Sequence, residues 1–294
     1  MTVLLSQLFT GISLGSILLL IALGLTFTFG QMGVINMAHG EFIMAGAYTA
    51  YLLQKALDDP AVSLLVALPV AFAVAGTMGG LLEITLIRRL YGRPLDTLLA
   101  TWGVSLFLQQ LARDLFGAPN VQVRAPSWLG GGLQLGSVTL PYSRLAILLL
   151  VATCLAGVAV VLSRSASGRR LRAVVQHRDL AALSGIRTGR VDQSTFFLGS
   201  GLAGIAGVAL TLLGSIGPTL GAGYIVDAFL VVVVGGLGQL RGAVLAALSL
   251  GLLNALVELQ TTASVAKVVV FVAIVVFLQV RPQGLVVLRT RSLT

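Results

Sequence analysis

Charged residues are scarce in this sequence, at 10% of its 294 positions. Soluble globular proteins carry about 25% charged residues, so this chain has too few polar side chains to cover a surface in contact with water. Hydrophobic residues make up 57% of the chain, and several apolar runs reach the roughly 20 residues that a helix needs to cross a bilayer. The composition therefore predicts an integral membrane protein with one transmembrane domain over residues 1–294.

Cysteine and histidine are almost missing, with one Cys and two His. Cys154 has no second cysteine for an internal disulfide, and a metal site would need three or four ligands. No Ser–His–Asp, Cys–His or paired-carboxylate arrangement stands out, and no nucleotide-binding motif occurs. We therefore predict no catalytic residue, no metal and no cofactor. Energy for active transport would have to come from another subunit or from an ion gradient.

Lys and Arg are absent from the first 54 positions, and elsewhere they gather where apolar runs end. The clusters lie at 88–93, at 164–190, and at Arg281, Arg289 and Arg291. The net charge of +9 could suggest nucleic acid, but this placement is typical of cytoplasmic loops under the positive-inside rule. We predict an all-α, multi-pass protein of the inner (plasma) membrane with about eight or nine crossings. Its N-terminus would lie outside and its C-terminus in the cytoplasm, with lipid around it and no nucleic-acid partner.

Two long polar segments separate the apolar runs. Residues 114–144 are rich in Gly and Pro and are predicted to form an extracytoplasmic loop, with Trp128 at the membrane interface. Residues 164–192 form the largest basic segment and are predicted to be cytoplasmic. Glu83, near the cytoplasmic end of its helix, is expected to pair with the arginine cluster that begins at Arg88.

Two glycine-rich segments interrupt apolar runs, one near residues 30–41 and one near 214–240. Gly30, Gly33 and Gly40 each weaken a helix by about 1 kcal/mol relative to Ala. Broken or re-entrant helices of this kind line substrate paths in transporters. The first segment could instead be an ordinary tight turn at the cytoplasmic face.

Polar residues within these segments are the candidate site. An acid in a membrane segment costs at least about 2.5–3.5 kcal/mol and rarely faces lipid, so Glu41 and Asp227 should point inward. Each could line a pathway or brace a broken helix through hydrogen bonds. Asn36 and His39 are expected to satisfy the backbone groups that the first break leaves free.

The basic segment contains a predicted short helix, DLAALSGI (179–186). Asp179 suits its N-terminus and Gly185 suits its end. Leu180 and Leu183 are three residues apart and share a face, which favours insertion into a groove on a cytoplasmic partner. The alternative is a basic loop held against anionic lipid head groups.

Four motifs resemble the permease subunits of branched-chain amino acid and urea ABC importers. They are MGVINMAHGEFIMAGAY (32–48), RAVVQHRDLAALSGIRTGRVD (172–192), YIVDAFLVVVVGGLGQLRGAVLAA (224–247) and RPQGL (281–285). TWGVSLFLQQLARDLFGAPN (101–120) with APSW (125–128) resembles the urea-type first permease most. His177 departs from the family, which often has Asn there.

The resemblance implies a non-enzymatic permease that works with a second, related permease as a heterodimer, two cytoplasmic ATP-binding subunits and an extracytoplasmic solute-binding protein. The expected cargo is urea or a similar small polar solute, and branched-chain amino acids are the alternative cargo. A less favoured alternative for the protein itself is a stand-alone channel or an ion-coupled carrier. The translocation candidates are Asn36, His39, Glu41 and Asp227. The resemblance assigns ATPase coupling to His177, Arg178, Asp179, Leu180, Ala181, Ala182, Leu183 and Gly185.

Overall fold

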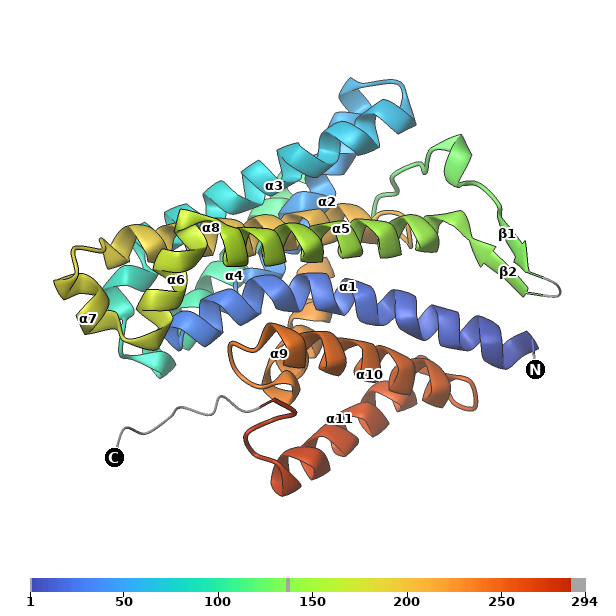
Figure 1. The fold of residues 1–294 in the computed structure, drawn as a ribbon. Helices are drawn as coiled ribbons and strands as arrows, with labels where there is room; N and C mark the ends of the chain where they lie inside the picture. The colour runs from blue at the N-terminus through green and yellow to red at the C-terminus, as the bar shows by residue number, and fades with distance from the viewer. Residues whose placement is uncertain (1, 136–137, 287–294) are drawn as a thin grey trace.

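The computed structural model describes residues 2–135 and 138–286, which form an almost entirely helical protein (Figure 1). Arg289 and Arg291 of the third basic cluster lie outside the described residues. The α-helices are, in chain order, α1 (Thr2–Met32), α2 (His39–Ala56), α3 (Pro60–Thr85), α4 (Pro94–Phe116), α5 (Tyr142–Arg164), α6 (Ala166–Gln176), α7 (Arg178–Leu183), α8 (Thr188–Leu210), α9 (Leu220–Gly235), α10 (Leu240–Glu258) and α11 (Ala263–Val280). Two short 3-10 turns are η1 (Ile87–Leu90) and η2 (Ser127–Leu129).

Six helices of the described chain are long and apolar enough to cross a membrane: α1, α3, α5, α8, α10 and α11. This confirms the predicted helical, multi-pass membrane protein. The α9 helix is apolar but shorter, and α2 and α4 are more polar helices that pack in the same bundle. The predicted number of crossings stays a prediction.

Capping residues read from the sequence explain where several helices begin. Asp59 precedes Pro60 and accepts a hydrogen bond from the Ala61 amide (2.7 Å), and the proline fills the first helical position, where no amide donor is needed. The hydroxyl of Ser165 accepts from the Gly168 amide (2.9 Å) and so separates α6 from α5.

The basic segments and the predicted outer loop lie at opposite ends of the bundle (Figure 1). Helices α6 and α7 lie at one end, and the N-terminal part of α1 lies at the other, beside a hairpin. That hairpin pairs β1 (Gly132–Leu135) with β2 (Val138–Pro141) in antiparallel register, with Gly132 opposite Pro141. It lies within residues 114–144, where the sequence predicted only a loop.

Glycines let the central helices touch backbone to backbone. Gly24 of α1 faces Gly199 of α8, and Gly46 of α2 faces Gly204 of α8. A Cβ added to Gly204 would also lie 2.5 Å from the carbonyl oxygen of Ala71 in α3. Small residues are what permits such approach in membranes, where no hydrophobic effect pulls one helix onto another. The α8 helix is therefore held at the centre, against α1, α2 and α3.

An interruption is present near each predicted segment, but the second is much shorter than the expected 214–240, because residues 220–235 form the continuous helix α9. The α1 helix continues to Met32, past Gly30, and ends where Gly33 adopts a φ of +63°. Residues 33–36 are non-helical, 37–38 form a turn, and α2 begins at His39. The second interruption falls between the end of α8 at Leu210 and the start of α9.

The variant Gly46→Ala tests the close contact between α2 and α8, and Gly80→Ala is its control. A Cβ at Gly46 would overlap the Gly204 backbone, whereas a Cβ at Gly80 would meet nothing within 4 Å. We expect Gly80→Ala to stabilise the protein by about 0.5–1 kcal/mol through helix propensity. Gly46→Ala should destabilise it by about 1–3 kcal/mol. Thermal unfolding in detergent measures both, and equal shifts would contradict the packing argument.

Candidate functional site

The first interruption carries the chain back into the bundle instead of around its end. The Nε2 atom of His39 lies 3.3 Å from the carbonyl oxygen of Ile21. Ile21 precedes the end of α1 at Met32 by eleven residues, which places His39 roughly 16 Å back from that end at about 1.5 Å per residue. The chain therefore folds back along α1 before α2 begins.

Asn36 organises the start of α2 from within the interruption. Its Oδ1 atom accepts a hydrogen bond from the Ala38 amide (3.1 Å), and its backbone carbonyl accepts from the His39 amide (3.3 Å). These bonds occupy amides that have no partner in the first turn of a helix. Asn36 therefore satisfies backbone groups at the break, as the sequence led us to expect.

A polar stripe on α4 faces the interruption and the first turn of α2. The Thr101 hydroxyl accepts from the Met37 amide (3.1 Å). One and two turns further on, the Ser105 hydroxyl and the Gln109 amide both donate to Oε1 of Glu41, at 2.8 and 2.9 Å. Glu41 is only 1% exposed, so these donors replace the water that its carboxylate would otherwise bind.

Three buried polar atoms around the break have no hydrogen-bond partner within the described part of the chain. They are Nδ2 of Asn36, Nδ1 of His39 and Oε2 of Glu41. Buried polar groups nearly always have partners, so these atoms have unused capacity for water or a polar solute. The set offers an amide donor, a carboxylate oxygen and an imidazole nitrogen.

The second interruption meets the first. Gly40 in the first turn of α2 faces Gly221 in the first turn of α9, and a Cβ on Gly40 would lie 2.7 Å from the Gly221 carbonyl oxygen. The N-termini of the two helices are thus side by side inside the bundle. Each N-terminus carries a partial positive charge, which favours an anionic or dipolar group nearby.

Asp227 does not lie with Asn36, His39 and Glu41 at the first interruption. It lines a cavity of about 740 Å³ between α1, α9, α10 and α11, and Glu41 is not among the lining residues. A carboxylate oxygen of Asp227 lies 3.8 Å from Nζ of Lys267 in α11. Glu258 and Asn254 line the same cavity, which therefore presents both signs of charge beside apolar walls.

The predicted coupling segment is tied to the bundle by charged and aromatic side chains. Arg178 bonds both oxygens of Asp192 in α8 (3.2 and 2.5 Å), and its guanidinium lies 5.4 Å from the centre of the Tyr91 ring. The Tyr91 hydroxyl donates to Glu83 (2.8 Å), and Glu83 also pairs with Arg88 (2.8 Å). This confirms the predicted Glu83–Arg88 pair and links α7 to α3 and α8.

These partners reinforce the charge states of the network outside the membrane spans. The hydrogen bond to Asp192 raises the pKa of Arg178, and the hydrogen bonds to Glu83 raise the pKa of Arg88. Burial raises the pKa of Tyr91 above its usual value. Both guanidinium groups therefore stay charged and the phenol stays neutral across the physiological pH range.

The short helix α7 presents its leucines outward. It begins at Arg178, one residue earlier than predicted, with His177 and not Asp179 at the N-cap position and no side-chain capping bond. It ends at Leu183, three residues earlier than predicted, and Gly185 follows with a φ of +83°. The Ile186 amide then bonds back to the Ala181 carbonyl (3.0 Å), which closes the helix as a Schellman motif. Leu180 and Leu183 are 57% and 83% exposed.

The remaining coupling residues divide between the two sides of α7. Ala181 is buried in a small cluster with Val174 and Val191, and Arg178 turns toward Asp192. His177, Asp179, Ala182 and Gly185 are exposed. The inward residues hold the helix to the protein, and the outward ones remain free for a partner.

Sequence reasoning missed the partners of the two acids. Thr101, Ser105 and Gln109 recur every four residues, a spacing that marks one helix face and could have been noticed in the sequence. The pairing of Asp227 with Lys267 joins α9 to α11 and leaves no local signal, because the two residues lie 40 positions apart.

The chain is similar to permease components of amino acid transport systems. A family model described as branched-chain amino acid transport system, permease component, matches residues 7–278. The high-affinity branched-chain amino acid transport system permease protein LivH of Salmonella typhimurium is 31% identical over 96% of this chain and 94% of its own length. BraD of Pseudomonas aeruginosa, with the same description, is 31% identical over 96% of this chain and 95% of its own length. A probable branched-chain amino acid transport permease protein LivH of Methanocaldococcus jannaschii is 27% identical over 92% of this chain and 88% of its own length. No solved structure matches the chain.

Arg178→Gln should destabilise the protein by about 3–5 kcal/mol, because the buried Asp192 carboxylate loses its charged partner. The double variant Arg178→Gln with Asp192→Asn leaves no charge buried and should recover a large part of that loss. Unfolding in detergent provides the free energies. Arg93→Gln is the control, since its pair with Asp96 is exposed and the change should stay within about 0.5 kcal/mol. A double variant no more stable than Arg178→Gln would refute the pairing argument.

Proposed function

Because the chain belongs to the family of branched-chain amino acid transport system permease components, we propose that it forms the membrane pathway of an ATP-driven importer for branched-chain amino acids. The observation that carries this proposal is similarity along nearly the whole chain, with residues 7–278 matched. As a permease component the chain is not itself an enzyme.

The partners follow from this assignment. Two cytoplasmic ATP-binding subunits would supply the energy, a second related permease would complete the pathway as a heterodimer, and an extracytoplasmic binding protein would deliver cargo. In this arrangement residues 164–192 form the cytoplasmic coupling loop of the permease domain 1–294, and residues 114–144 lie outside. The separation of α6 and α7 from the β-hairpin supports that orientation.

The cargo proposed here is an amino acid instead of urea. The relatives above are named for branched-chain amino acids, and nothing among them supports the urea-type expectation. The Asp227 cavity also suits a zwitterion, because Lys267 can attract a carboxylate and Asp227 can attract an ammonium group. Leu14, Leu18 and Phe271 on its walls can accommodate an aliphatic side chain.

Two regions would divide the work of transport. The Asp227 cavity holds charged groups that would be costly to expose to lipid. The second permease is therefore expected to cover this cavity and make it part of the pathway. Asn36, His39 and Glu41 line the deeper break, where their unused polar atoms would contact cargo or water as the pathway changes its opening.

Motion would enter through α7. Closure of the ATP-binding subunits would push on Leu180 and Leu183, the two exposed leucines of α7. The Arg178–Asp192 pair would carry that force into α8, and Tyr91 would carry it toward α3. A rigid connection of this kind moves packed helices together.

Uptake by the complete complex in liposomes tests the cargo. Labelled leucine should be imported with ATP and binding protein, and labelled urea should not. Lys267→Gln should lower leucine uptake about ten-fold, the equivalent of one lost charge contact. The control is Lys55→Gln, which alters the chain's other lysine; Lys55 does not line this cavity and lies over the Tyr51 ring. Urea uptake, or leucine uptake without the ATP-binding subunits, would refute the proposal.

Leu180→Ser with Leu183→Ser tests the docking helix. Both side chains are exposed, so the permease should keep its folding stability within about 0.5 kcal/mol. Co-purification of the ATP-binding subunits and ATP-dependent uptake should both fall strongly. Val175→Ser, an exposed apolar residue of the neighbouring α6, should leave both unchanged. Normal uptake by the double variant would remove α7 from the coupling mechanism.

A further inference from the structure

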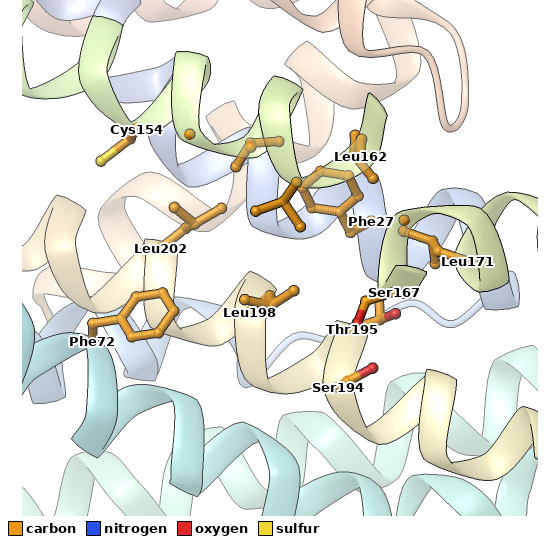
Figure 2. Close-up of a pocket in the computed structure, with 14 residues that line it drawn as sticks. Phe27, Phe72, Cys154, Leu162, Ser167, Leu171, Ser194, Thr195, Leu198 and Leu202 are labelled. Carbon is orange, nitrogen blue, oxygen red and sulfur yellow. The ribbon is translucent and has the colours of Figure 1, made fainter. Parts of the chain in front are cut away.

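An apolar groove separates α5 from α8 near the α6 end of the bundle (Figure 2). Its volume is about 220 Å³, smaller than the roughly 300–1,000 Å³ of ordinary small-molecule pockets. Its walls are almost entirely apolar: Phe27, Phe72, Val158, Leu162, Leu198 and Leu202. No function proposed so far uses it.

The groove runs along the two helices for much of one leaflet. On α5 it extends from Cys154 to Leu162, and on α8 from Leu202 back to Ser194. Eight residues of helix span about 12 Å, compared with about 15 Å for half of a 30 Å hydrocarbon core. An extended acyl chain lying parallel to the helices matches this length.

A basic hollow continues from the end of the groove. Ser167 and Ser194 line both spaces, so the apolar groove and the hollow adjoin at these two residues. Arg170, Arg187 and Arg190 surround it, and none of their side chains makes an ion pair within residues 2–135 and 138–286. Three arginines that have no ion-pair partner in the described part of the chain therefore line the hollow at the end of an apolar slot.

We propose that this combined site binds one anionic phospholipid, with an acyl chain in the α5–α8 groove and the phosphate on Arg170, Arg187 and Arg190. A zwitterionic lipid would fill the groove and carry the same phosphate, but its cationic group would leave the net positive charge of the hollow unchanged. A soluble phosphate would satisfy the arginines but leave the groove empty. Guanidinium groups suit phosphate because their planar donors can bond two oxygens at once.

The bound lipid would also reach the proposed coupling helix. Ser184 and Gly185, directly after α7, line the same hollow. A head group there would hold the C-terminal end of α7 against α6 and α8. The site thus makes the position of α7 sensitive to the lipid composition of the surrounding leaflet.

Native mass spectrometry of the full chain in detergent, titrated with phosphatidylglycerol, tests the proposal. We expect one tight site that phosphatidylcholine fills much more weakly. Arg170→Gln with Arg187→Gln and Arg190→Gln should weaken binding roughly a hundred-fold, at about five-fold per arginine near a membrane surface. The matched control is Arg164→Gln with Arg169→Gln and Arg172→Gln, which removes three charges from the same basic segment but none from the residues that line the hollow. Equal weakening by both triple variants would overturn the site.

A second pair of variants tests the groove itself. Gly157 lines it, and a Cβ there meets nothing within 4 Å, so Gly157→Leu should fill the slot without disturbing the backbone. Binding should weaken about ten-fold or more, while Gly103→Leu, at an equally open position on α4, should have no effect. Unchanged binding in Gly157→Leu, or equal affinity for glycerol 3-phosphate, would show that no acyl chain occupies the groove.

Discussion

Gly24 and Gly199 face each other where α1 crosses α8, and Gly40 and Gly221 do the same where α2 meets α9. Backbone contact at these crossings leaves no room for a side chain on either helix. In a membrane this packing replaces the hydrophobic effect as the force that holds helices together. It also brings carbonyl groups and helix ends close to one another, and the interrupted segments depend on that proximity.

The close crossings make the break at residues 33–38 possible. His39 reaches the Ile21 carbonyl only because glycine at position 24 leaves space beside the ring. Part of the remaining polar demand is met by α4, whose Thr101 accepts from the Met37 amide and whose Ser105 and Gln109 donate to Glu41. Inside a bilayer such bonds have no competition from water, so an incompletely satisfied group is an expensive feature and a candidate for contact with solute.

The coupling end of the molecule uses a different physical principle. There, water is near, and Arg178, Tyr91 and Glu83 form a chain of charged and aromatic contacts that locks α7 onto two long helices. The leucines of α7 take no part in this chain and remain exposed. One short helix therefore combines a firm attachment to the permease with a free apolar face.

The amino-acid sequence is enough to predict the membrane character, an interruption in each half of the chain, a short helix that stops before Gly185 and the Glu83–Arg88 pair. Each of these rests on composition, glycine placement or residues a few positions apart. Tertiary structure alone decided that Glu41 meets Ser105 and Gln109, that Asp227 meets Lys267 in a separate cavity, and that α5 and α8 leave a groove between them. Such pairings depend on how distant helices cross, and crossing is set by side-chain volume at many positions together, which no local pattern encodes.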